Sequence, residues 1–215
     1  MTNRAFKTVP GGSRRREKPN STMITDACAD SANMQKLTVG DVFKGRNGQK
    51  LAIVNLCVLT PQEPCRCPFP AGVYNGDGTE VRVSLDLQLT GSNIKLFEDL
   101  DRQILKMAHE RSVEWFGKQL TPDVIESKYF RMCRYREGEE LPRLRCKVNL
   151  ESVRCWNQKK EPVLEIPSNR FQGMLIRPRL QLLTVWFMST QFGCSVQVTD
   201  IQLPDDAVSQ DECPF

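Results

Sequence analysis

The feature that most limits the fold of this chain is a strict alternation of apolar and polar residues in two separate stretches. In residues 80–89 every second residue is apolar, and in residues 143–149 the apolar residues again alternate with charged or polar ones. A period of two residues puts successive side chains on opposite faces of a β-strand. Both stretches are therefore predicted to be strands of a sheet with one face in the core and one in water.

Between these two strands lies the clearest helical pattern of the chain. Residues 97–118 carry apolar side chains near one face of a helix and carboxylates in the first turn. Further strands are predicted at 39–43 and 51–59 and within 163–203, where 180–188 is apolar on both faces and should be a buried central strand. The order predicts a mainly β domain: an OB-fold-like Greek-key barrel with an inserted long helix, with a β-sandwich carrying a helical insertion as the competing architecture.

The two ends of the chain differ in charge from the middle. Residues 1–36 are polar and basic without periodicity, and we expect a disordered arm there, followed by one folded domain over 37–204 and an acidic tail over 205–215. There is no apolar run long enough to cross a membrane and no apolar leader, so an intracellular protein without membrane contact is expected. The nine cysteines are odd in number and irregularly spaced, which argues against a disulfide framework.

The residues that enzymes use for catalysis are scarce. His109 is the only histidine, and the Gly-rich loops that bind phosphates are missing from the sequence. We therefore expect no enzyme, no catalytic residues and no cofactor. Cys57, Cys65 and Cys67 allow a zinc site as an alternative, but the paired spacing of structural zinc sites is missing, so ordinary cysteines and no metal are expected.

A basic stretch with interleaved aromatics, residues 128–160, carries the strongest functional signal. Alternation puts Arg143, Arg145 and Lys147 on the wet face of one strand, about 7 Å apart, which suits the phosphates of an extended single strand. Aromatic side chains nearby would stack on bases. The alternative is a solvated basic face with these aromatics in the core, as is expected for Trp186 and Phe187. The predicted nucleic-acid-binding residues are Arg131, Arg134, Tyr135, Arg143, Arg145, Lys147, Arg154, Trp156 and Lys159.

The last residues reverse the charge of the chain and end in an aromatic residue. Four carboxylates stand there without a Lys or Arg, and the predicted partner-binding residues are Asp205, Asp206, Asp211, Glu212, Pro214 and Phe215. Such a tail resembles those of bacterial single-stranded DNA-binding proteins, in which the terminal Phe docks in an apolar pocket of a partner and the carboxylates meet Lys and Arg. The alternative is an ordinary solvated terminus.

A wider resemblance covers roughly residues 80–215. The segment 173–203, with Trp186-Phe187 and Phe192-Gly193, and the segment 142–148 resemble small proteins of large nucleocytoplasmic DNA viruses. Those proteins look similar to phage single-stranded DNA-binding proteins, which have an OB-fold, an inserted helix and an acidic tail ending in Phe. The resemblance implies a viral origin and action at sites of DNA replication, in the nucleus or the cytoplasm.

Together these patterns predict a non-enzymatic single-stranded DNA-binding protein for DNA replication, recombination or repair. Its tail is expected to recruit replication proteins, and a homo-oligomer is possible. Two other functions stay open at this point. One is a minor structural or assembly protein of a virion, and the other is an RNA-binding protein, for which the basic arm would be the footprint.

Overall fold

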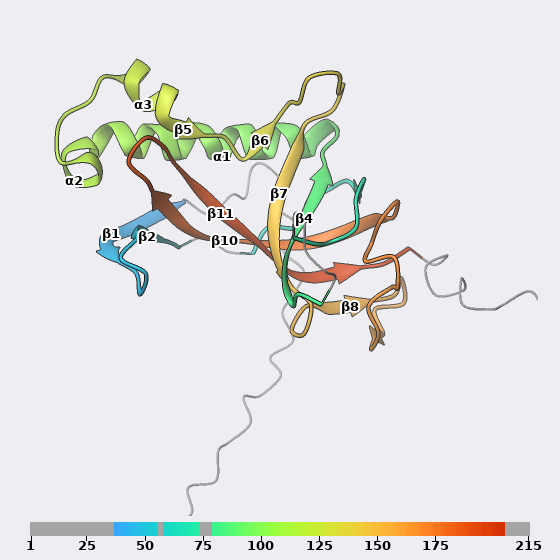
Figure 1. Cartoon of the computed structure of the whole chain (residues 1–215). Coiled ribbons are helices and arrows are strands. Elements are labelled where there is room, and N and C mark those ends of the chain that lie inside the picture. Colours follow the sequence, from blue (N-terminus) through green and yellow to red (C-terminus); the bar gives the residue numbers. More distant parts are fainter. Residues whose placement is uncertain (1–36, 56–57, 74–78, 205–215) are drawn as a thin grey trace, which may run out of the picture.

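The computed structural model describes residues 37–55, 58–73 and 79–204, and within these residues the chain is mainly β, as predicted (Figure 1). The predicted basic arm (1–36), the acidic tail (205–215) and Cys57 lie outside the described residues. The division into arm, domain and tail therefore stays a prediction. The elements are β1 Thr38–Lys44, β2 Lys50–Asn55, β3 Cys65–Arg66, β4 Arg82–Gln88, α1 Gly91–Glu110, α2 Ser112–Phe116, α3 Pro122–Lys128, β5 Tyr129–Phe130, β6 Cys133–Arg134, β7 Arg143–Asn149, β8 Arg154–Trp156, β9 Pro162–Val163, β10 Leu175–Phe187 and β11 Phe192–Gln202.

All strands of the described residues belong to one sheet, which has eleven strands. Five of them pair in a ring, β10–β3–β4–β7–β11 and back to β10. Two joints of this ring are single residue pairs, Arg66 with Gln88 and Gln197 with Lys147. The barrel is therefore not closed, and the prediction of a barrel was wrong to that extent, because a two-residue β3 cannot pair β4 along its length. The β-sandwich is not seen, since these strands form one sheet.

The remaining strands extend this ring at two ends. The β1–β2 hairpin pairs with the end of β10, and the β8–β9 hairpin pairs in parallel with the end of β11. Figure 1 shows the two hairpins on opposite sides of the molecule, with β10 and β11 running between them. The long β10–β11 pair is therefore the central hairpin of the sheet, and both of the other hairpins pair with it.

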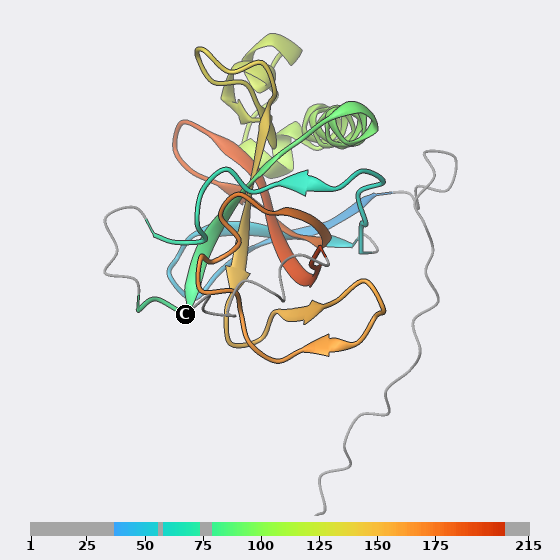
Figure 2. The same cartoon turned by 90° about the vertical axis from the view of Figure 1, so that its right-hand side faces the viewer.

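The inserted helix begins earlier than its sequence pattern predicts, at Gly91, and is interrupted at Arg111 before α2. The carboxylate of Glu63 explains the early start: it accepts the Ser92 N–H (3.0 Å) and the Thr90 hydroxyl (2.6 Å). The first contact satisfies a backbone donor that a helix start leaves unpaired, and the second holds the side chain of the residue before the helix. Glu63 lies far upstream in the sequence, so local periodicity could not reveal it. α1 lies along one side of the sheet and is seen nearly end-on in Figure 2.

The alternation in β4 and β7 is confirmed. Leu144, Cys146 and Val148 are buried, and the residues between them face outward. The prediction for 180–188 is only partly right, because β10 is fully buried on one face alone: Val185 and Phe187 are buried, whereas Trp186 between them is only half-buried. The outer face of β10 thus carries a large aromatic side chain.

The cysteines that the structure describes are free thiols, and five of the six are buried. Burial raises the pKa of the Cys65 and Cys67 thiols to about 12. Among the described residues no group of three or more His, Cys, Asp or Glu is arranged to hold a metal ion. None of the described helices is long and apolar enough to cross a membrane.

Candidate nucleic-acid interface

The outer face of β7 carries the three cations that the sequence pattern singled out, but they are not equally available. Arg145 and Lys147 are exposed. The Arg143 side chain is only 13% exposed: it pairs with Glu139, and its guanidinium carbon lies 4.5 Å from the centre of the Phe69 ring. Two cations of this strand therefore face solvent, and the third is held against its neighbours.

Arg145 is oriented by the carboxylate directly opposite it on β4. Asp86 and Arg145 are partners in the β4–β7 ladder, and the guanidinium donates to both carboxylate oxygens, at 2.8 and 3.1 Å. Arg136 also pairs with Asp86, at 3.8 Å. Asp86 is 8% exposed, whereas half of the Arg145 side chain (51%) reaches solvent. The carboxylate thus fixes the guanidinium at the surface and leaves part of it open to a ligand.

Positive charge extends over the neighbouring strands. The strands β4, β7, β8, β10 and β11 carry more cations than carboxylates: Arg82, Arg143, Arg145, Lys147, Arg154, Arg177 and Arg179 against Asp86 and Asp200. Both carboxylates are paired with arginines. An anion approaching this part of the sheet therefore meets positive charge with little competing negative charge.

An aromatic pair lies at one end of β11. The ring centres of Phe130 and Trp186 are 5.8 Å apart, and the guanidinium carbon of Arg134 lies 4.0 Å from the centre of the Phe130 ring. Phe130 is 37% exposed, and Tyr135 in the following loop is 60% exposed. Burial, together with the charges of Arg145 and Arg136, lowers the pKa of Arg134.

This aromatic pair was missed by the sequence analysis, which placed Trp186 in the core. The signal that could have revealed it is Gly193, which lies opposite Trp186 in the β10–β11 ladder. A Cβ atom at Gly193 would come within 2.7 Å of the Trp186 indole and 3.1 Å of the Phe130 Cβ. The glycine therefore gives the two rings room to lie over the strand.

A second aromatic and cationic group lies at the other end of β11. Asp200 accepts the Trp156 indole N–H at 3.2 Å and pairs with Arg154 at 2.7 Å. The Trp156 side chain is half-buried, and the Arg154 side chain is 60% exposed. Parallel pairing of β8 with β11 sets Arg154 beside Asp200. Trp156 is therefore fixed by a hydrogen bond and presents only part of its ring to solvent.

β11 links the two groups on one outer face. Lys147 pairs with Gln197, and its amino group lies 3.5 Å from the Ser195 hydroxyl. The buried side chains of this strand are first at even-numbered positions, such as Val196 and Val198, and then at odd-numbered ones, Ile201 and Leu203. The switch occurs where the register with β10 shifts. A register shift of this kind is a β-bulge, and it keeps Asp200 on the same side of the strand as Gly193 and Ser195.

We call this surface the β11 track. It runs roughly 20 Å along the strand, at about 3.3 Å per residue, and its members are Phe130, Arg134, Arg145, Lys147, Arg154, Trp156 and Trp186. Cations that lie between aromatic rings along an extended strand can contact the phosphates and bases of a single-stranded nucleic acid.

The remaining predicted residues lie away from the centre of this track. Arg131 is 44% exposed and pairs with Glu126, and Lys159 is exposed between β8 and β9. The predicted tail residues lie outside the described residues. The structure thus brings Arg134, Arg145 and Lys147 to the middle and one end of one surface, and Arg154 and Trp156 to its other end.

Comparisons with known proteins give three results. None of the curated proteins matches the sequence. Among solved structures, the chain is similar to the single-stranded DNA-binding protein of bacteriophage Enc34 in complex with ssDNA, with a TM-score of 0.44, 11% identity and coverage of 79% of this chain and 93% of that one. It is also similar to gp2.5, a single-stranded DNA-binding protein of bacteriophage T7, with a TM-score of 0.47, 11% identity and coverage of 74% and 97%. A family model matches residues 76–214, and the chain therefore belongs to DUF5871, a family of unknown function.

Proposed function

We propose that this chain is a single-stranded DNA-binding protein, built on a partly open barrel of the OB type and acting without catalysis. The observation that supports this function is the β11 track, where cations lie between two aromatic groups along one outer face of the sheet. OB-type sheets bind extended strands with this combination of residues. Strands of the ring β10–β3–β4–β7–β11 carry this face.

The chemistry of the track favours a single strand over a duplex. Arg145 and Lys147 are spaced for phosphates of an extended backbone, and neutralising phosphates releases counterions, which makes binding sensitive to salt. Phe130 and Trp186 present ring surface at the level of the sheet. A base can stack there only if it is unpaired, and each stacked base contributes about 1–3 kcal/mol.

We further propose a role in replication, recombination or repair, with the acidic tail as the recruiting segment. Asp205, Asp206, Asp211 and Glu212 would meet cations of a replication protein, and Phe215 would fill an apolar pocket on it. The same carboxylates would compete with DNA for the cations of the track. The tail thus would couple release from DNA to contact with a partner.

A titration of the protein with labelled oligothymidylate at two salt concentrations tests this function. We expect binding that weakens steeply with salt, and tighter binding when residues 205–215 are deleted. Absence of binding at low salt would overturn the proposal and favour a structural or assembly protein of a virion. Stronger binding of RNA than of DNA with the same base sequence would favour the RNA-binding alternative.

A further inference from the structure

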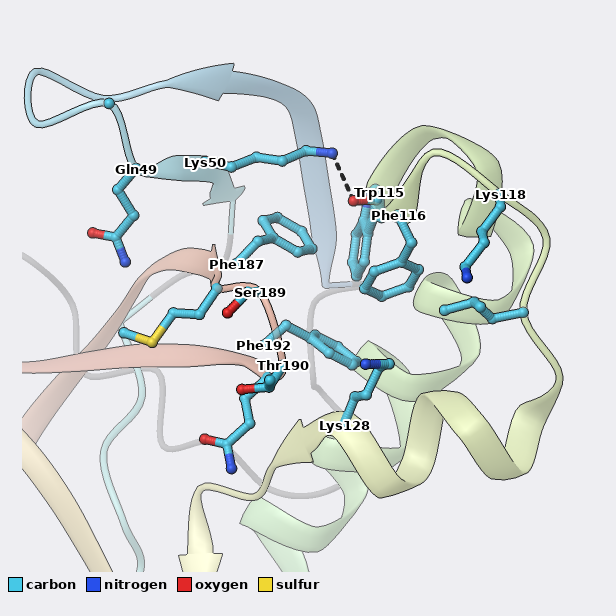
Figure 3. A pocket seen from close by; sticks show the side chains of 14 residues that line it. Gln49, Lys50, Trp115, Phe116, Lys118, Lys128, Phe187, Ser189, Thr190 and Phe192 are labelled. Carbon is cyan, nitrogen blue, oxygen red and sulfur yellow. Dashed lines mark hydrogen bonds between the residues drawn. The ribbon is translucent and has the colours of Figure 1, made fainter.

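A pocket of about 510 Å³ lies at the tip of the β10–β11 hairpin, outside the β11 track. Figure 3 shows Gln49 and Lys50 on one side of it and Lys118 and Lys128 on the other, with the hairpin turn between them. Its volume is within the range of small-molecule sites in proteins. The pocket is therefore large enough for a nucleotide unit.

The charge around this pocket is positive. Its lining includes Lys50, Lys118 and Lys128 and no Asp or Glu. The Lys50 amino group donates hydrogen bonds to the carbonyl oxygens of Trp115 (2.6 Å) and Glu114 (3.2 Å). Some of its N–H donors are therefore already used by α2. The amino groups of Lys118 and Lys128 form no hydrogen bond or ion pair with any residue that the structure describes. Two lysines are thus open to an anion.

The floor of the pocket is aromatic. Trp115, Phe187 and Phe192 pack edge to face or in parallel, with ring centres 5.3–6.3 Å apart. These three side chains are buried, whereas Phe116 at the wall is half-buried and Met188 in the turn is 62% exposed. A flat apolar group could lie against Phe116 and Met188 while an anion attached to it contacts the lysines.

The pocket lies beside the Trp186 end of the β11 track, on the other face of the β10–β11 hairpin, because the adjacent residues Phe192 and Gly193 point to opposite faces of β11. Phe192 lines the pocket, and the next residue, Gly193, lies beneath the Trp186 and Phe130 rings. Lys128 immediately precedes β5, whose Tyr129 and Phe130 pair with Phe192 and Gly193. A strand that leaves the Trp186 end of the track and passes over the hairpin tip would reach Lys128 next.

We propose that this pocket is the end of the nucleic-acid path and binds a nucleotide of the same single strand. Lys118 and Lys128 would contact its phosphate, and its base would lie against Phe116 and Met188. This inference rests on the proposed function. The positive charge alone would suit an acidic peptide equally well, but the end of the track lies next to the pocket, and this proximity favours a nucleotide.

The test measures affinity for a series of oligothymidylates that differ by one nucleotide, with the full chain and a Lys118→Ala, Lys128→Ala variant. We expect wild-type affinity to rise with length until the strand reaches the pocket. The variant should bind short oligonucleotides with wild-type affinity, and its affinity should stop rising at a shorter length. For long oligonucleotides, the slope of its log K against log salt should be smaller by about 0.7 per lost phosphate contact. A Lys95→Ala, Lys106→Ala variant of α1 removes the same charge outside the pocket and should leave the length dependence unchanged.

The outcomes separate this inference from the function on which it rests. If the wild-type protein binds no oligonucleotide of any length, the proposed function fails. If it binds short ones and the Lys118 and Lys128 variant matches it at every length and salt concentration, only the pocket assignment is overturned. A synthetic peptide of residues 205–215 is titrated in parallel, because loss of peptide binding with intact oligonucleotide affinity in the variant would also overturn it.

Discussion

Trp186 and Gly193 face each other across the β10–β11 ladder, and the absence of a side chain at Gly193 lets the indole lie across β11 beside Phe130. The two residues are close in the sequence but sit on different strands. The Trp186 indole and the Phe130 ring form the aromatic surface at this end of the β11 track. The position of the ring therefore depends on the smallest residue of the strand below it.

Gly193→Ala should displace the Trp186 ring. The added Cβ would lie 2.7 Å from the indole and 3.0 Å from the Phe130 carbonyl oxygen, distances that force a shift. We expect weaker binding of oligothymidylate and a loss of stability of about 1–3 kcal/mol, as for other overpacked sites. Gly40→Ala in β1, with its nearest contact at 3.7 Å, is the matched control. Equal affinities of the two variants would show that the indole position is irrelevant to binding.

The two tryptophans of the track should respond differently to truncation. Trp186→Ala removes the ring that lies over Gly193 and should cost about 1–3 kcal/mol in affinity for a single strand. Trp156 is tied to Asp200 by its indole N–H, so Trp156→Ala also leaves a carboxylate with one partner fewer and should lower the melting temperature more. Affinity and thermal unfolding are measured on both variants. A Trp186→Ala protein with normal affinity would remove this residue from the interface.

The cations of β7 should differ in their contribution to salt dependence. Arg145→Ala and Lys147→Ala remove exposed charges and should each reduce the slope of log K against log salt by about 0.7. Arg143→Ala should change the slope less, because its side chain is 13% exposed and is held by Glu139 and Phe69. Titrations at several salt concentrations give the three slopes. A larger change for Arg143 than for Lys147 would mean that Arg143, and not Lys147, is the residue open to the phosphates.

The features of the fold and the site that could be predicted from the sequence are those that depend on neighbouring residues alone. The period-two patterns gave β4 and β7 within two residues, because alternation reports burial directly. The start of α1 was missed because Glu63, which holds it, lies in a distant loop. Trp186 was assigned to the core because an apolar run does not show which face of β10 is covered. The pairing of Asp86 with Arg145 depends on sheet register, which no local pattern contains.

Asp101 should give the protein a pH-dependent stability. Its carboxylate is 1% exposed and accepts the Tyr129 hydroxyl at 2.6 Å and the Met132 N–H at 3.2 Å. Burial raises the pKa of Asp101 in the folded state, so the folded state binds the proton more tightly than the unfolded one. The resulting stabilisation is complete below the unfolded pKa of about 3.9 and is lost as the pH rises through the folded pKa.

Asp101→Asn should remove this contribution to the pH dependence. The difference in unfolding free energy between wild type and variant should then change in favour of the variant as the pH rises through that range. Chemical denaturation at a series of pH values measures it. Lost hydrogen-bond geometry in the variant would shift the whole curve by a constant, so the diagnostic quantity is the slope. Parallel curves for the two proteins would show that the pKa of Asp101 is not raised.

Deleting residues 205–215 should tighten single-strand binding, most at low salt. The segment carries four carboxylates and no cation, and a tethered anion competes with DNA at an effective concentration that can reach millimolar. Screening by salt weakens this competition, so the affinities of the full and truncated chains should converge as salt is added. Titrations of both chains at low and high salt measure the effect.

Phe215→Ala separates the two proposed roles of the tail. The substitution keeps the four carboxylates and removes the apolar anchor, so DNA affinity should match that of the full chain while capture of a replication protein from a host extract is lost. Asp211→Asn with Glu212→Gln is the complementary variant: it keeps Phe215, and it should tighten DNA binding through the loss of competing charge. If truncation leaves DNA affinity unchanged and Phe215→Ala loses no partner, the tail has neither role. That result would favour the alternative of a virion assembly protein, because recruitment of a partner would no longer distinguish this protein from a basic structural component.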